Sequence, residues 1–379
     1  MKAIALIDGE HSPDVVRRAL VDLPYEWVGV IFAGGGEKVR PGESYGVPLV
    51  EGFDGAEALV DLSDEPALGP DARFRWAARA LAAGLTYVGA DFRFDPPVYD
   101  EVGAPSIAVI GTGKRVGKTA VAAHLARLLS SDHDVVVVTM GRGGPPDPET
   151  VERPPDLDAL LALSRSGRHA ASDHLEIAAV AGVTTIGCRR TGGGLVGRPL
   201  VSNVPEGARL AAELGPDLVV FDGSGTAIPP VAADRRVLVV GPGHDLDSPF
   251  GSYRRLISDL VVAVGCKVEG ALSATLRLRP LEPLAGRVAV FTAGPADVSH
   301  LAADVVYASS NLGDRETLAR ELETIEADAY LTELKGAAID VVAEHAVAHD
   351  RSVVLAANDL VASGLDEALL ALVPEAVSA

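Results

Sequence analysis

The feature that most constrains the fold is GTGKRVGKTA, residues 111–120, a glycine-rich stretch between an apolar run and an amphipathic pattern. The apolar residues 106–110 predict a buried strand, and AVAAHLARLL over 120–129 predicts a helix. In a strand–loop–helix of this kind, backbone N–H groups and the positive end of the helix dipole converge where phosphate oxygens bind. The stretch therefore predicts an α/β fold with a phosphate-binding loop at the edge of a sheet.

The spacing of this loop fits the pattern G-x-x-x-x-G-K-[ST] at Gly117, Lys118 and Thr119, although the first position holds threonine with a glycine on each side. Lys118 is predicted to reach the β- and γ-phosphates of ATP, and the Thr119 hydroxyl to hold Mg²⁺. The predicted nucleotide-binding residues are Gly113, Lys114, Arg115, Val116, Gly117, Lys118, Thr119 and Ala120. Lys118 and Lys114 are predicted to act in catalysis together with Arg142.

Strands and helices alternate along the rest of the chain, which predicts parallel sheets covered on both faces. Buried strands are expected at 2–8, 27–33, 135–140, 218–222 and 236–241, and a helix at 337–348. Proline-rich stretches near 93–105 and 279–286 suggest three domains: an N-terminal α/β domain (1–100), a phosphate-loop ATP-binding domain (101–282) and a C-terminal α/β domain (283–379). The fold class is thus α/β, with a central parallel-sheet phosphate-loop NTPase domain flanked by smaller N- and C-terminal α/β units.

Charge and composition limit the classes of partner. The chain carries 33 basic and 53 acidic residues, a net charge of −20, and such a surface repels nucleic acid. No apolar run approaches the roughly 18 residues of a membrane helix, and the N-terminal MKAIALIDGE predicts a buried strand rather than a signal peptide. Two cysteines are too few for a disulfide framework. We expect a cytoplasmic protein with no nucleic-acid or membrane partner.

An acidic residue at the end of a neighbouring strand is a further requirement of a phosphate loop. LVVFDGSG supplies Asp222 after four apolar residues, and the two glycines that follow allow close approach to the phosphates. Asp222 is therefore the predicted Mg²⁺ ligand beside Thr119, directly or through water.

Two arginine-bearing segments stand out in a chain this acidic. GRGGPPDPE follows a predicted strand, which places Arg142 at the sheet edge where α/β proteins bind ligands. CRRTGGGLVGRP sets two arginines before exposed glycine backbone, a composition that suits a second phosphate group because guanidinium grips oxyanions in a bidentate manner. A solvated loop with incidental arginines is the alternative. The predicted substrate-binding residues are Arg142, Arg189, Arg190, Gly192 and Gly193.

The phosphate loop is similar to those of dethiobiotin synthetases and cobyrinate amide synthetases. Over nearly the full chain, the order of IDGEH, GTGKRVGKTA, MGRGGPP, RRTGGG, FDGSG and ELKGAAIDV resembles the cyclic 2,3-diphosphoglycerate synthetases. This resemblance implies an ATP- and Mg²⁺-dependent ligase that closes an intramolecular phosphoanhydride in 2,3-diphosphoglycerate, a small phosphorylated acid. It also implies phosphorylation of 2-phosphoglycerate and a homodimer.

Other interpretations stay open on the residues alone. One is another ATP-dependent ligase of the dethiobiotin or cobyrinate type, and another is a nucleotide-switched regulatory ATPase. The sequence leaves undecided the natural substrate, a requirement for K⁺, the dimer interface and the roles of the terminal units. It also leaves undecided whether Asp8, Asp173 and Lys335 line the site.

Overall fold

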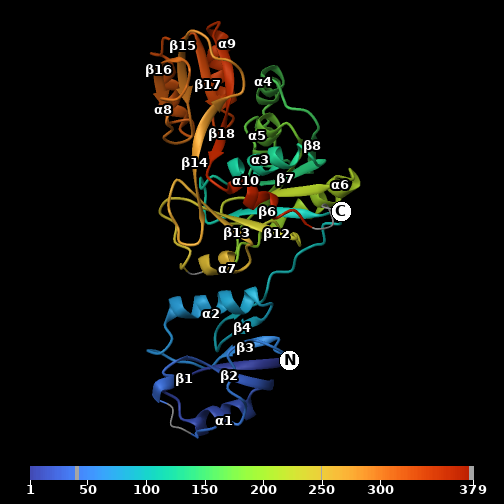
Figure 1. Ribbon diagram of the computed structural model, residues 1–379, viewed down its shortest axis with the longest axis vertical. Helices are drawn as coiled ribbons and strands as arrows, with labels where there is room; N and C mark the ends of the chain where they lie inside the picture. Colours follow the sequence, from blue (N-terminus) through green and yellow to red (C-terminus); the bar gives the residue numbers. More distant parts are fainter. Residues whose placement is uncertain (39–41, 249, 375–379) are drawn as a thin grey trace. The chain divides into compact units, whose positions relative to one another are not determined.

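A computed structural model describes residues 1–38, 42–248 and 250–374 (Figure 1). It confirms the predicted α/β class, because helices alternate with the strands of a large, mostly parallel sheet. Contacts divide the chain into two compact units, Met1–Val98 with Asp245–Ile257, and Tyr99–His244 with Ser258–Ala379. The boundaries proposed near residues 100 and 282 stay a prediction. No helix in the described ranges is long and apolar enough to span a membrane.

The first unit is built on a sheet of five strands within its described residues. The strands, in sheet order, are β2 (Glu26–Gly34), β1 (Lys2–Asp8), β3 (Ala58–Asp61), β4 (Thr86–Val88) and β5 (Arg93–Phe94), all parallel except the β4–β5 pair. The helices are α1 (Pro13–Asp22), α2 (Pro70–Ala82), the later α7 (Gly251–Leu256) and the short η1 (Gly36–Lys38). The α7 segment belongs here because Phe250 packs on Phe74 and Phe94, with ring centroids 5.3 and 5.7 Å away.

The second unit is organised by one continuous sheet. Its strands, in order, are β10 (Val201–Ser202), β9 (Thr184–Thr191), β7 (Val135–Gly141), β11 (Leu218–Asp222), β6 (Ser106–Gly111), β12 (Arg235–Val240), β13 (Leu260–Val264), β14 (Leu272–Pro280), β18 (Ser352–Val361), β17 (Ala329–Glu333), β15 (Arg287–Phe291) and β16 (Asp304–Ser309), with β8 (Glu149–Val151) beside β9. The helices are α3 (Lys118–Leu129), α4 (Leu157–Arg165), α5 (Asp173–Ala181), α6 (Val204–Glu213), α8 (Arg315–Leu322), α9 (Glu344–Ala348) and α10 (Leu365–Leu370).

Strand β14 makes this sheet continuous. Its first residues pair with β13 in parallel, and from Thr275 to Pro280 it pairs with β18 in the antiparallel direction. The phosphate-loop strands and the C-terminal strands therefore share one hydrogen-bonded ladder. The helix predicted over 337–348 forms in two pieces, a π-helical segment η2 (Ala338–Ala343) followed by α9.

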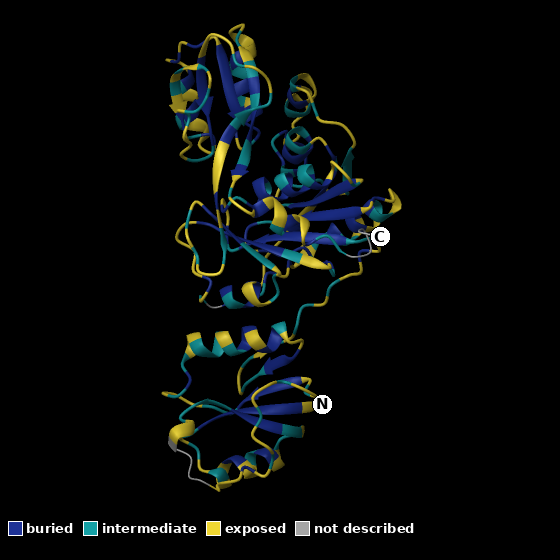
Figure 2. Ribbon diagram, viewed as in Figure 1, coloured by how far each residue is buried: buried dark blue, intermediate teal, exposed yellow. Residues whose placement is uncertain are grey.

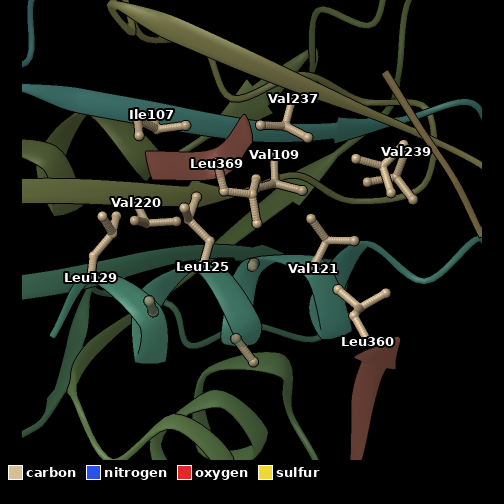
Figure 3. Close-up of a cluster of buried hydrophobic side chains, with 14 of the residues drawn as sticks. Ile107, Val109, Val121, Leu125, Leu129, Val220, Val237, Val239, Leu360 and Leu369 are labelled. Carbon is tan, nitrogen blue, oxygen red and sulfur yellow. The ribbon is translucent and has the colours of Figure 1, made fainter. Parts of the chain in front are cut away.

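Helix α3 lies against the centre of the sheet (Figure 3). Val121, Leu125 and Leu129 recur every four residues, so they share one face of the helix and pack on the valines and isoleucine of β6, β11 and β12. The strands beneath α3 are buried along their length (Figure 2). Leu360 of β18 and Leu369 of α10 complete the cluster. This packing fixes the first turn of α3 at the edge of the sheet.

Replacement of Leu369 by alanine tests this core. The Leu369 side chain is fully buried, whereas its neighbour Leu370 is 45% exposed. We expect Leu369→Ala to destabilise the second unit by about 2–5 kcal/mol, because apolar burial is lost and a cavity remains. Leu370→Ala is expected to change the free energy of unfolding by less than about 0.5 kcal/mol. Thermal unfolding followed by circular dichroism measures both. Equal Tm values for the two variants would contradict the assigned packing.

Candidate functional site

The phosphate loop joins β6 to α3, and the local structure explains why glycine is needed at positions 111, 113 and 117. Gly117 adopts φ +94°, a left-handed conformation that side chains rarely tolerate. A Cβ at position 111 would lie 2.6 Å from Cδ of Lys118, and one at position 113 would lie 2.1 Å from Cε1 of His244. The glycines beside the first position of the motif therefore leave room for the Lys118 side chain and the His244 ring.

Lys118 begins α3 and is buried under its own loop. Its Nζ donates to the carbonyl oxygen of Gly113 at 2.9 Å. Burial lowers the pKa of Lys118, while the carboxylates of Asp222 and Asp173 oppose this shift. The ammonium thus sits beside the loop backbone, where the N–H groups of a phosphate loop converge.

Thr119 and Asp222 meet beside the loop, although they are far apart in sequence. The Thr119 hydroxyl donates to Oδ2 of Asp222 at 3.2 Å. Asp222 is 1% exposed at the end of β11, and its Oδ1 has no hydrogen-bond partner among the described residues. Burial and the neighbouring Asp173 carboxylate raise the pKa of Asp222 to about 8. An unpartnered, buried carboxylate oxygen beside a hydroxyl fits a cation.

Magnesium is usually held by one or two protein ligands, with phosphate oxygens and water filling the remaining positions. Thr119 and Asp222 match this sparse donor set. Within the described ranges, no group of three or more His, Cys, Asp or Glu side chains is arranged to hold a metal ion. The residues therefore fit Mg²⁺ bound together with a nucleotide rather than a site built wholly by protein ligands.

Arg142 and Arg190 converge on the loop after β11. A Cβ at Gly225 would lie 3.0 Å from Nη2 of Arg142 and 3.5 Å from Nη2 of Arg190. Arg190 is buried and donates to the carbonyl oxygens of Gly192 at 2.7 Å and Ser224 at 2.9 Å, and its buried Nε has no hydrogen-bond partner among the described residues. Burial, assisted by the charge of Arg142, lowers the pKa of Arg190. Two adjacent guanidinium groups repel each other and favour an anion between them.

The structure separates Arg189 from Arg190, which the sequence had grouped. Both residues lie in β9, and successive side chains of a strand point to opposite faces. Arg189 is exposed and its Nε donates to the carbonyl oxygen of Pro146 at 2.9 Å. None of the predicted residues Arg189, Arg190, Gly192 and Gly193 lines the cavity described next. Arg190 lies just behind the lining, because it donates to the carbonyl oxygens of Gly192 and of the lining residue Ser224.

A cavity of about 1010 Å³ lies beside these groups, and Lys118, Thr119 and Arg142 line it. Its walls come from the phosphate loop, the segments that follow β7 and β11, the first turn of α5, and parts of β14, β17 and β18 with their loops. Lys114 and Arg115 lie exposed on its lining, and Arg115 has a positive φ of 62°. The Arg115 guanidinium approaches Gly313, since a Cβ there would lie 3.1 Å from Nη2.

Two further lining residues, Glu333 and Lys335, belong to an ion-pair group that joins α5 to the end of β17. Nζ of Lys335 lies 3.1 Å from Oε1 of Glu176 and 3.8 Å from Oε1 of Glu333. Burial, together with the Asp173 and Glu333 carboxylates, raises the pKa of Glu176 to about 7, although Lys335 opposes the shift. Burial also raises the pKa of Asp173 at the start of α5.

Of the three residues left undecided by the sequence, the structure places Asp173 and Lys335 on the cavity lining and Asp8 elsewhere. The Asp8 carboxylate is buried and accepts from the backbone N–H groups of Glu10, His11 and Asp64 and from Nδ1 of His11. It therefore holds loops of the first unit together. Sequence reasoning missed Glu176, whose only signal was its position three residues after Asp173 on the same helix face.

The sheet topology, the glycine-bearing loop before α3 and the Thr119–Asp222 pair define a P-loop protein of the α/β class. Family comparison agrees. Residues 106–278 match the description "Cyclic 2,3-diphosphoglycerate synthetase, P-loop domain", residues 2–95 its N-terminal domain, and residues 287–359 its C-terminal domain. The chain belongs to the cyclic 2,3-diphosphoglycerate synthetase family.

Relatives carrying that name cover almost the whole chain. The protein from Rubrobacter xylanophilus is 47% identical over 98% of this chain and 97% of its own length. Those from Thermococcus gammatolerans and Methanothermus fervidus are 40% and 36% identical, over 97% and 99% of this chain and 96% and 97% of their own lengths. These matches support a synthetase role. Among solved structures, LpxK from Aquifex aeolicus in complex with ATP gives a TM-score of 0.45 at 14% identity, covering 73% of this chain and 91% of its own, a likeness too weak to carry an argument.

The raised pKa of Glu176 makes stability depend on pH. Its value of about 7 lies above the roughly 4.3 of an unfolded glutamate, so the folded state holds the extra proton between these pH values. The free energy of unfolding therefore falls as pH rises through this window. We expect the difference in Tm, Glu176→Gln minus the unaltered protein, to become more positive as the pH rises from 5 to 7.5.

The matched control is Glu344→Gln, which removes a partly exposed carboxylate paired with Arg165 at 2.8 Å. The ion pair lowers the pKa of Glu344, so its titration lies below this window. Its Tm difference is expected to stay flat from pH 5 to pH 7.5. A Glu176→Gln difference that is also flat would show that Glu176 titrates normally.

Proposed function

We propose that this protein uses ATP and Mg²⁺ to close the intramolecular phosphoanhydride of cyclic 2,3-diphosphoglycerate from 2,3-diphosphoglycerate. One observation carries the proposal. The phosphate loop and the Arg142–Arg190 pair belong to the same part of the fold, beside a cavity of about 1010 Å³ that has room for a nucleotide and a small acid. Family membership and the names of the relatives support the same reaction.

The nucleotide's phosphates would lie on the loop from Gly113 to Ala120, with Lys118 at the β- and γ-phosphates. Thr119 and Asp222 would hold Mg²⁺, which when bound neutralises charge on the phosphate oxygens. The orphaned Oδ1 of Asp222 supports this assignment. Lys114 and Arg115, which line the cavity and are exposed, would add positive charge at its mouth.

The acceptor's phosphates would be held by Arg142 and Arg190. The reaction begins when an oxygen of one acceptor phosphate attacks the γ-phosphorus of ATP, the bond to the bridging β–γ oxygen breaks, and ADP leaves. An oxygen of the second acceptor phosphate then attacks the first acceptor phosphorus, and inorganic phosphate leaves as the ring closes. Phosphate is already anionic at neutral pH, so positioning and charge neutralisation are the main demands.

The same site would phosphorylate 2-phosphoglycerate, because Asp173 supplies what a hydroxyl acceptor needs. A hydroxyl must lose its proton as it attacks, and a carboxylate at the start of α5 lies on the cavity lining near Lys118. Burial raises the pKa of Asp173, which makes its ionised form a better proton acceptor. A homodimer, which the resemblance implies, and a K⁺ requirement remain proposals.

Phosphorus NMR of the protein with ATP, Mg²⁺ and 2,3-diphosphoglycerate tests the reaction. We expect new phosphoanhydride signals, and a loss of at least about 100-fold in their rate of appearance in Lys118→Ala, since this variant removes a charge from the developing transition state. The matched control is Lys267→Ala, an exposed lysine that does not line the cavity. ATP hydrolysis without phosphoanhydride signals would refute the proposed acceptor chemistry.

The neighbouring arginines of β9 give a second test. Arg190→Gln is expected to raise the KM for 2,3-diphosphoglycerate at least about tenfold, because a charge-assisted hydrogen bond to phosphate is lost. Arg189→Gln is expected to change it less than about twofold, because Arg189 binds Pro146 on the other face of the strand. Steady-state kinetics with both substrates varied measures the effect. Equal KM values in the two variants would exclude Arg190 from the acceptor site.

A further inference from the structure

Lys335 is a half-buried cation that the chemistry above does not use. It follows β17 and lines the same cavity as Lys118, but on the opposite, C-terminal part of the sheet. Its ammonium lies 3.1 Å from Oε1 of Glu176 and 3.8 Å from Oε1 of Glu333. An ammonium has three donors, so these two carboxylates leave it capacity for an anion in the cavity.

The carboxylates that hold Lys335 are themselves fixed. Oε2 of Glu333 accepts from the backbone N–H of Ala293 at 2.6 Å, and its Oε1 accepts from the side-chain amide of Asn358. Glu176 lies buried on the first turns of α5. The ammonium is therefore held from two elements at once, as a pre-organised binding group must be.

Asp173 lines the same cavity as Lys118 and Lys335. Burial raises the pKa of Asp173, and the positive charges of Lys335 and Lys118 oppose this shift. Both ammonium groups therefore lie near this one carboxylate. If the γ-phosphate of ATP lies at Lys118, a molecule that accepts it shares a cavity with Lys335. The position of Lys335 is thus suited to the acceptor and not to the nucleotide.

The choice of lysine at this position is informative. The chain has 33 basic residues, of which six are lysines, and three of these six, Lys114, Lys118 and Lys335, line the cavity. Elsewhere the chain forms its ion pairs mostly with arginine, and the Arg165–Glu344 pair already links α4 to α9. A compact ammonium contacts an anion as a point charge, whereas the planar fork of arginine suits bidentate contact with carboxylate or phosphate.

We propose that Lys335 binds the carboxylate of the acceptor and so selects phosphorylated carboxylic acids over other bisphosphates. This inference rests on the proposed function, in which the two phosphates of the acceptor lie at Arg142, Arg190 and the reacting γ-phosphate. The carboxylate is then the anionic group that remains, and Lys335 is the lysine or arginine of the described lining to which the proposed function gives no role.

The test compares 2,3-diphosphoglycerate with glycerol 1,2-bisphosphate, which lacks the carboxylate, by isothermal titration calorimetry without ATP. The variant is Lys335→Gln with Glu176→Gln, a pair that removes the lysine without leaving Glu176 unpaired. We expect the unaltered protein to bind 2,3-diphosphoglycerate at least about tenfold more tightly than the analogue, and the double variant to lose this preference. The affinity for the analogue should stay within about twofold.

The control is Arg165→Gln with Glu344→Gln, which breaks an exposed ion pair between the same two parts of the unit and should keep the preference. A purely structural Lys335 would weaken both ligands equally, and that result overturns the inference. An unaltered protein without the preference, or one that binds neither ligand, overturns it as well. An unaltered protein with the preference but no phosphoanhydride product in phosphorus NMR refutes the proposed reaction and leaves the role of Lys335 standing.

Discussion

The contact between α3 and the sheet is the interaction on which the site depends. Val121, Leu125 and Leu129 bury one face of the helix on β6, β11 and β12. Because Lys118 and Thr119 form the first turn of the same helix, this apolar packing sets where the ammonium and the hydroxyl lie. It also brings Thr119 to Asp222, which ends a strand beneath the helix.

Much of the fold follows from local sequence. The alternation of apolar runs and amphipathic segments predicts the α/β class, and the expected strands at 2–8, 135–140 and 218–222 match β1, β7 and β11 within a residue. The role of β14 does not follow in this way. The local sequence LSATLRLRP does not predict that the strand pairs in parallel at one end and antiparallel at the other. Its partner β13 precedes it in sequence, and its other partner β18 follows it by up to about 90 residues.

The candidate site can be predicted from the sequence where its residues belong to one local motif. The loop places Lys118 and Thr119 by itself, and a strand end places Asp222. The motif RRTGGG does not predict how its two arginines are placed. It suggests two equivalent cations, whereas Arg189 and Arg190 point to opposite faces because side chains alternate along a strand. Glu176 lies in an ordinary helix, and its environment comes from Lys335 and Glu333, which no pattern near residue 176 can reveal.

The continuity of the second unit's sheet through β14 has a mechanical consequence. Backbone hydrogen bonds run without a break from the strand that precedes the phosphate loop to the strand that precedes Lys335. The two walls of the cavity are therefore parts of one sheet, and they are joined where β14 changes its partner between Ala274 and Thr275. Admission and release of small molecules can then involve a bend at this point of β14 as well as the connecting loops, such as those that carry Arg115 and Gly313.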